Sequence, residues 1–215
     1  LFFHKLNPFS PKKSPKARNQ TWQLWFKVVA AVIPSAVLGL LLDDWMEAHL
    51  YNYVVVAIAL IVYGVAFLYL EQGNGRIAPR IKSVHAIDYK TALLIGAFQC
   101  LSLIPGTSRS GSTILGAILL GVGRSAGAEF SFFLAIPTMV GASGLKLVKF
   151  LASGVAVTGV EIGVLVVGCL VSFLVSFLVI KALMDYVRSH SFRVFGIYRI
   201  ALGIVVLIYF LFTLI

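Results

Sequence analysis

Residues 105–113 read Pro-Gly-Thr-Ser-Arg-Ser-Gly-Ser-Thr, a polar stretch that lies between two apolar runs, residues 91–104 and 114–122. A helix needs about 20 apolar residues to cross a bilayer, and neither run is that long. We therefore predict that residues 91–122 form a re-entrant hairpin whose polar loop lies within the membrane. An arginine at that depth costs about 2.5–3.5 kcal/mol, so Arg109 should face a hydrated cavity lined by protein and have a partner.

The composition is that of a polytopic membrane protein. Of the 215 residues, 60% are hydrophobic and only 12% are charged, which lies far outside the usual range of soluble domains. The net charge of +10 could suggest a nucleic-acid partner. The basic residues, however, lie mostly in connecting segments, where they mark the cytoplasmic face. We therefore expect a single all-α membrane domain over residues 1–215 and no nucleic-acid partner.

Hydropathy divides this domain into spans and loops. Residues 1–20 are basic and contain three prolines, so we expect a non-helical cytoplasmic loop. Acidic residues Asp43, Asp44 and Glu47 predict a solvated outer connection, and residues 71–75, 123–129 and 181–199 are expected to be turns or loops. Lys146 and Lys149 fall on the predicted outer side, a mild violation of the charge rule. The predicted full spans are residues 22–42, 53–70, 130–148, 159–180 and 200–215.

Other features of the sequence predict little chemistry. Cys100 and Cys169 lie in apolar runs and indicate neither a disulfide framework nor a metal site. The chain begins with Leu1 and shows no secretory signal, so we expect it to begin within a longer protein.

The loop at residues 105–113 has the features of a phosphate site. Glycines let backbone N–H groups approach an anion, and the start of the following helix presents unpaired donors and the positive end of a dipole. Arg109 offers a planar fork for two oxygens. The hydroxyls of Ser108, Ser110, Ser112 and Thr113 can add donors, and Thr113 lies one helical turn on from Ser110, so these side chains can converge with Arg109 on one ligand.

A purely structural alternative stays open, in which Ser110 or Ser112 caps a helix and Arg109 reaches the head groups. The loop also lacks a nearby base that could activate a serine. His85 and Asp88, at helix-compatible spacing, are more simply solvated loop residues. Arg124 and Glu129 are expected to pair with each other, which would contribute little as a plain ion pair.

The loop resembles the Pro-Gly-x-Ser-Arg-Ser-x-x-Thr motif of the undecaprenyl-diphosphate phosphatase family, which is associated with bacitracin resistance. Residues 129–137, Glu-Phe-Ser-Phe-Phe-Leu-Ala-Ile-Pro, are similar to the segment that follows the motif in that family. The family's acidic Glu-x-x-x-Glu motif, with its Ser-rich stretch and His, has no counterpart here. That departure leaves the expected metal ligands and the expected base outside this chain.

The resemblance implies an inverted-repeat membrane fold with re-entrant hairpins in the bacterial cell (inner) membrane. It implies hydrolysis of undecaprenyl diphosphate to undecaprenyl phosphate and inorganic phosphate, which recycles the lipid carrier of peptidoglycan synthesis. Carried over to this loop, it implies that Arg109, Ser108 and Thr113 are catalytic and that the other loop positions bind substrate: Gly106, Thr107, Ser110, Gly111 and Ser112. A divalent cation, Mg²⁺ or Ca²⁺, is also implied, with its ligands in the segment expected before Leu1. This chain alone is then expected to be inactive, and membrane lipid and a second copy of the chain are expected partners.

Two functions other than diphosphate hydrolysis are alternatives. Broken helices that meet in the membrane also bind anions in secondary transporters, so a transporter or flippase of an anionic lipid or small anion stays possible. A vanadate-sensitive acid phosphatase is disfavoured, because its Ser-Gly-His and Arg-x-x-x-x-x-His elements are absent from the sequence.

Overall fold

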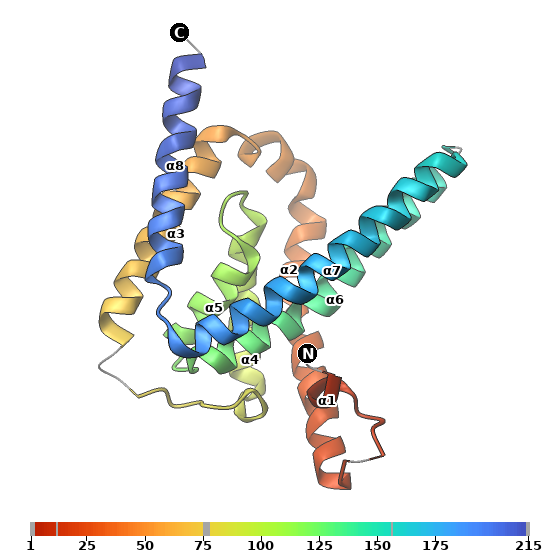
Figure 1. The fold of residues 1–215 in the computed structure, drawn as a ribbon, viewed down its shortest axis with the longest axis vertical. Coiled ribbons are helices and arrows are strands. Elements are labelled where there is room, and N and C mark those ends of the chain that lie inside the picture. Colours follow the sequence, from red (N-terminus) through yellow and green to blue (C-terminus); the bar gives the residue numbers. More distant parts are fainter. Residues whose placement is uncertain (1–2, 12, 75–77, 156, 214–215) are drawn as a thin grey trace.

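The computed structural model describes residues 3–11, 13–74, 78–155 and 157–213, and this part of the chain is helical without named strands. Five of its helices, α2, α3, α6, α7 and α8, are long and apolar enough to cross a membrane. The prediction of an all-α integral membrane fold is confirmed. The elements, drawn in Figure 1, are α1 (Phe3–Leu6), α2 (Pro15–Leu50), α3 (Tyr53–Asn74), η1 (Val84–Ala86), α4 (Tyr89–Cys100), η2 (Leu101–Leu103), α5 (Arg109–Leu119), α6 (Arg124–Ala152), α7 (Gly159–Ser189) and α8 (Arg193–Thr213).

Helix α2 starts earlier and ends later than predicted. Pro15 occupies its first turn, and the Ser14 side chain accepts a hydrogen bond from the Ala17 amide. Proline is tolerated there because the first amides of a helix have no partner within it. The prediction of a non-helical segment over residues 1–20 was therefore wrong for residues 3–6 and 15–20, whereas residues 7–11, 13 and 14 are non-helical as predicted. The acidic residues Asp43 and Glu47 lie inside α2 and do not form the connection to α3.

Three other predicted loops are largely helical. α3 continues to Asn74, so residues 71–74 of the predicted turn at 71–75 are helical. Residue 75 lies outside the described residues. α6 begins at Arg124, and α7 continues to Ser189. Charged residues such as Glu, Lys and Arg are good helix formers, so these helices extend past their apolar segments. Hydropathy marks the apolar part of a helix and leaves its ends undefined.

The short helices α4 and α5 form a hairpin joined by η2 and the polar loop (Figure 1). With 12 and 11 residues, they are about 18 and 17 Å long, less than the roughly 30 Å of a hydrocarbon core. Both helices lie in the segment for which a re-entrant hairpin is predicted; its re-entry into the bilayer, the depth of its loop and its place in an inverted repeat remain predictions. α4 packs along α2, where a Cβ at Gly96 would overlap the Ala31 carbonyl.

Helices α3 and α8 run antiparallel and in close contact. The rings of Tyr53 and Phe210 stack at one end, with centroids 4.2 Å apart. Further along, a Cβ on Gly64 would lie 2.7 Å from the Gly196 carbonyl oxygen, and one on Gly203 would lie 2.9 Å from that of Ala57. Small residues let membrane helices approach at backbone distance. These glycines therefore fix how α8 sits against α3.

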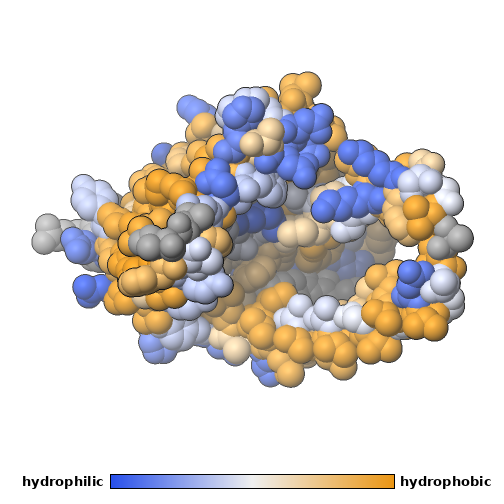
Figure 2. Space-filling model, turned by 90° about the horizontal axis from the view of Figure 1, so that it is seen from above, coloured by the Kyte–Doolittle hydropathy of each residue, from blue (hydrophilic) through white to orange (hydrophobic). Residues whose placement is uncertain are grey.

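Helices α6 and α7 form an antiparallel pair that extends away from the rest of the molecule (Figure 1). The 18-residue apolar window of α7 is 0% buried, and that of α6 is 17% buried. Figure 2 shows hydrophobic side chains over most of the visible helical surface, with hydrophilic residues gathered in patches. Such a surface suits contact with lipid, in which apolar side chains carry no cost.

We predict that Gly64→Leu destabilises the protein, because the added side chain would displace the α8 backbone. Overpacking of this kind typically costs about 1–3 kcal/mol. The matched control is Gly168→Leu in α7, where an added Cβ meets nothing within 4 Å. Unfolding in mixed detergent micelles, followed by circular dichroism, should show a lower midpoint for Gly64→Leu alone; equal midpoints would contradict the proposed α3–α8 contact.

Candidate functional site: the loop before α5

The loop before α5 has an unusual backbone. Ser108 is the N-cap of α5, and its Oγ accepts a hydrogen bond from the Gly111 amide at 3.2 Å. Its φ is 57°, and among the described residues Ser108 is the one non-glycine residue with a positive φ. Gly106 has a φ of 93°, and a Cβ there would lie 2.6 Å from the Val56 carbonyl oxygen. Strained backbone of this kind persists where the surrounding structure enforces it, often at functional sites.

Arg109 is held by two neighbouring helices. Its Nε donates to the Gln99 Oε1 of α4 at 3.2 Å, and its Nη2 donates to the Ser131 carbonyl of α6 at 3.1 Å. Gln99 is itself 1% exposed and donates to Ser35 of α2. Arg109 thus has the polar partners that an arginine among apolar helices requires. No hydrogen bond of its Nη1 is found among the described residues, and Arg109 is not one of the residues that line the cavity beside the loop.

Three of the predicted hydroxyls are buried and already bonded. The Oγ1 of Thr113 lies 2.6 Å from the Ser131 Oγ, and the Ser112 Oγ donates to the Tyr63 hydroxyl at 3.0 Å. Thr107 donates to the Leu101 and Ile104 carbonyls. In this structure these side chains fix the loop and its helix. Contact of Thr113 with a ligand would require its bond to Ser131 to open.

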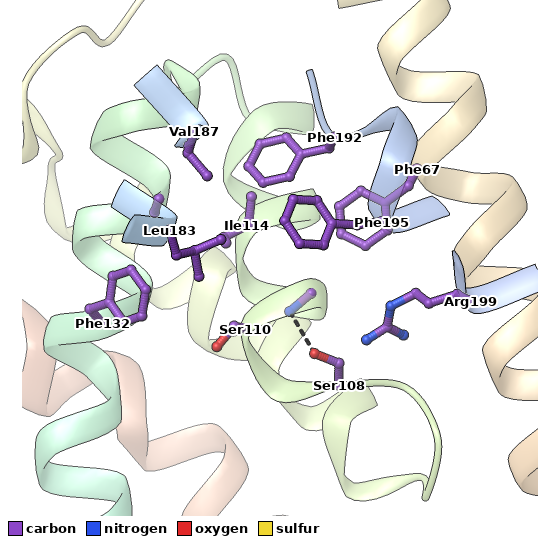
Figure 3. Close-up of a pocket in the computed structure, with 12 residues that line it drawn as sticks. Phe67, Ser108, Ser110, Ile114, Phe132, Leu183, Val187, Phe192, Phe195 and Arg199 are labelled. Atoms are coloured by element: carbon purple, nitrogen blue, oxygen red, sulfur yellow. Dashed lines mark hydrogen bonds between the residues drawn. The ribbon is translucent and has the colours of Figure 1, made fainter. Parts of the chain in front are cut away.

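The hydroxyls of Ser108 and Ser110 behave differently, because both line a cavity of about 180 Å³. Whole-ligand pockets usually measure about 300–1,000 Å³, so this cavity has room for only part of a large lipid. In Figure 3 the two serines lie at one end, and aromatic and aliphatic side chains occupy the other. The apolar lining comprises Phe67, Ile114, Ala128, Phe132, Leu183, Val187, Phe192 and Phe195.

Several polar residues outside the loop motif complete the site and were not predicted from the sequence. Arg199 of α8 lines the cavity, and Gln99, Ser131 and Tyr63 hold the loop and α5. All four are polar residues within or beside apolar runs. Polar side chains at membrane depth usually have a functional or packing role, and this signal could have identified them.

The other predicted residues lie elsewhere. Arg124 pairs with Glu71, and Lys5 pairs with Glu129 at 2.8 Å, so the predicted Arg124–Glu129 pair was wrong. The first turns of α6 are helical, and this places the two side chains against different neighbours. Asp88 caps α4 by accepting from the Thr91 amide at 2.8 Å, and these hydrogen bonds lower its pKa.

His85 lies in η1, outside the loop and the cavity. Partial burial, together with the positive charges of Lys5 and Lys13, lowers its pKa from the usual value. A neutral imidazole is therefore favoured near neutral pH. Its Nδ1 is buried with no hydrogen-bond partner, and His85 is not among the residues that line the cavity, so the structure assigns it no catalytic role.

The residues that the structure describes include no group of three or more His, Cys, Asp or Glu side chains that could hold a metal ion. A tightly held divalent cation needs several oxygen or nitrogen ligands. The side chains of the described residues therefore do not by themselves form the metal site that the resemblance implies.

The fold and the site together define a multi-pass membrane protein whose polar loop, set between short helices, is suited to an anion. The chain belongs to the bacitracin resistance protein BacA family, which matches residues 1–205. It is 59% identical over 210 residues to a protein of Limosilactobacillus fermentum named undecaprenyl-diphosphatase, covering 98% of this chain and 76% of the relative.

Two other proteins named undecaprenyl-diphosphatase have a similar sequence identity to this chain. One from Streptococcus thermophilus is 56% identical over 209 residues, which cover 97% of this chain and 73% of the relative. One from Enterococcus faecalis is 53% identical over 213 residues, which cover 99% and 77%. The resemblance stated from the loop motif is thereby confirmed.

Proposed function

We propose that this protein is an undecaprenyl-diphosphatase of the bacterial cell membrane. It hydrolyses undecaprenyl diphosphate to undecaprenyl phosphate and inorganic phosphate, returning the lipid carrier to peptidoglycan synthesis, and so contributes to bacitracin resistance and cell shape. The single observation that carries this proposal is 53–59% identity over nearly the whole chain to proteins of that name. The loop before α5 supplies chemistry that agrees with it.

The loop can stabilise the charge of a phosphoryl group in transfer. The first amides of α5, the hydroxyls of Ser108 and Ser110, and the guanidinium of Arg109 are all donors, and the dipole of α5 favours an anion at its start. In the reaction the oxygen of water forms a bond to the terminal phosphorus, the anhydride P–O bond breaks, and undecaprenyl phosphate leaves with the bridging oxygen. Fixed donors around such a group contribute mainly by electrostatic stabilisation.

The alternative function, a transporter or flippase, is not favoured by the family. The two functions are separated by incubating undecaprenyl diphosphate with the detergent-solubilised protein as its natural gene encodes it. We expect release of inorganic phosphate in the absence of any vesicle. Movement of lipid across a vesicle membrane without phosphate release would overturn the proposed function.

We predict that Arg109→Lys lowers turnover at least tenfold. A lysine carries one nitrogen and cannot bond Gln99, the Ser131 carbonyl and a phosphate in the geometry of the planar guanidinium. The matched control is Arg80→Lys on the exposed segment between α3 and α4. Phosphate release should fall in Arg109→Lys and stay near normal in Arg80→Lys; normal turnover in Arg109→Lys would show that the fork is dispensable.

We further propose that the reaction depends on a divalent cation, Mg²⁺ or Ca²⁺, as the family resemblance implies. When bound, such an ion would share the negative charge of the diphosphate. Treatment with EDTA should abolish phosphate release, and added Mg²⁺ or Ca²⁺ should restore it. Full activity in excess EDTA would contradict this dependence.

A homodimer is also proposed, supported by the large exposed apolar surface of α6 and α7. Lipid can cover the same surface, so the oligomeric state needs its own measurement. Light scattering in detergent, corrected for the bound micelle, should give the mass of two chains. The mass of one chain would refute the dimer under those conditions.

A further inference from the structure

Arg199 approaches the loop from a side that Arg109 does not reach. Its Nη1 lies 3.4 Å from both the Gly106 and the Thr107 carbonyl oxygens. Its guanidinium extends from α8 toward the start of α5 in Figure 3. Arg109, in contrast, bonds α4 and α6 and is not among the residues that line the cavity. Two guanidinium groups therefore flank the same loop from different sides.

The charge of Arg199 is poorly matched by its protein partners. Strong hydrogen bonds from a guanidinium to oxygen measure about 2.7–2.9 Å, so two contacts of 3.4 Å are weak. Neither the Lys5–Glu129 ion pair nor the Arg124–Glu71 ion pair includes Arg199. A cation that is partly removed from water and lacks a counter-charge is costly. An anionic ligand in the cavity would supply that counter-charge.

The position of Arg199 is fixed by packing. It lies on α8 between Gly196 and Gly203, the two α8 glycines that contact the α3 backbone. The same helix and the turn before it carry Phe192 and Phe195, which line the apolar part of the cavity. Arg199 is thus a charge at the boundary between a polar end and an aromatic end of one cavity. This is the pattern that suits a lipid where its phosphate joins its hydrocarbon chain.

We propose that Arg199 binds the phosphate that is esterified to the prenyl chain, the one that remains on the lipid after hydrolysis. This inference rests on the proposed function. The prenyl chain leaves that phosphate toward Phe67, Phe192 and Phe195, while the loop around Ser108 and Arg109 receives the terminal phosphoryl group. Arg199 is then a substrate-binding residue that also contacts the product undecaprenyl phosphate but not inorganic phosphate.

The test compares how the two products of hydrolysis bind to the protein. The protein is used as its natural gene encodes it, solubilised in detergent. The probes are undecaprenyl phosphate and inorganic phosphate, with binding measured by titration calorimetry and inhibition measured in the hydrolysis assay. Arg199→Gln should weaken undecaprenyl phosphate binding about 10- to 100-fold, the usual range for a lost charged hydrogen bond. KM for undecaprenyl diphosphate should rise by a similar factor, and inhibition by inorganic phosphate should be unchanged.

Matched variants separate binding from a structural role. Arg193→Gln removes the same charge from an exposed position at the start of α8 and should change neither affinity. Arg199→Lys keeps the charge and should recover part of the lost affinity; it also serves as the test variant if Arg199→Gln does not fold. If Arg199 only held the Gly106 and Thr107 carbonyls, affinities for both products and kcat would change together.

Two results would overturn the inference: unchanged binding of undecaprenyl phosphate to Arg199→Gln, or equal weakening of both products. A failure of the proposed function would give another result: the unmodified protein would release no phosphate from undecaprenyl diphosphate. The calorimetric comparison of Arg199→Gln with Arg193→Gln does not require turnover, so it decides the role of Arg199 in either case.

Discussion

The guanidinium of Arg109 among apolar helices is the constraint on which the arrangement of the site depends. A charge in that setting is tolerated only with polar partners, and the chain supplies them from two helices: the Gln99 amide of α4 and the Ser131 carbonyl of α6. Gln99 in turn donates to Ser35 of α2, and the Ser131 hydroxyl bonds Thr113. One charge therefore links four helices around a strained loop.

A second constraint is the backbone contact between α3 and α8. Gly64, Gly196 and Gly203 allow these helices to approach more closely than larger side chains would. Because α3 also touches the loop at Gly106, the position of α8 and the position of the loop are fixed by one helix. The cavity between them joins serine hydroxyls to a set of phenylalanine rings, a combination that suits an amphiphile.

The helices α6 and α7 illustrate how a bilayer changes the rules of burial. In water, the exposed leucines, valines and phenylalanines of α7 would drive collapse onto the rest of the protein. In lipid they are already in an apolar solvent, so a helix pair can extend with little burial. Elsewhere the helices are in closer contact, as around Gln99 and Arg109 and along α3 and α8.

The sequence by itself determined the class of fold, most of the spans and the family, because apolar length and a nine-residue motif are local properties. It also located the loop at residues 105–113 and the need of Arg109 for partners. Helix ends were missed where charged residues extend a helix into water, as at Pro15, Arg124 and Ser189. Only the tertiary structure decided which hydroxyls face the cavity, that Gln99 and Ser131 hold Arg109, and that Arg199 contacts loop residues 92 and 93 positions earlier in the chain. Such pairings depend on how helices cross in space, and no local pattern in the chain encodes that.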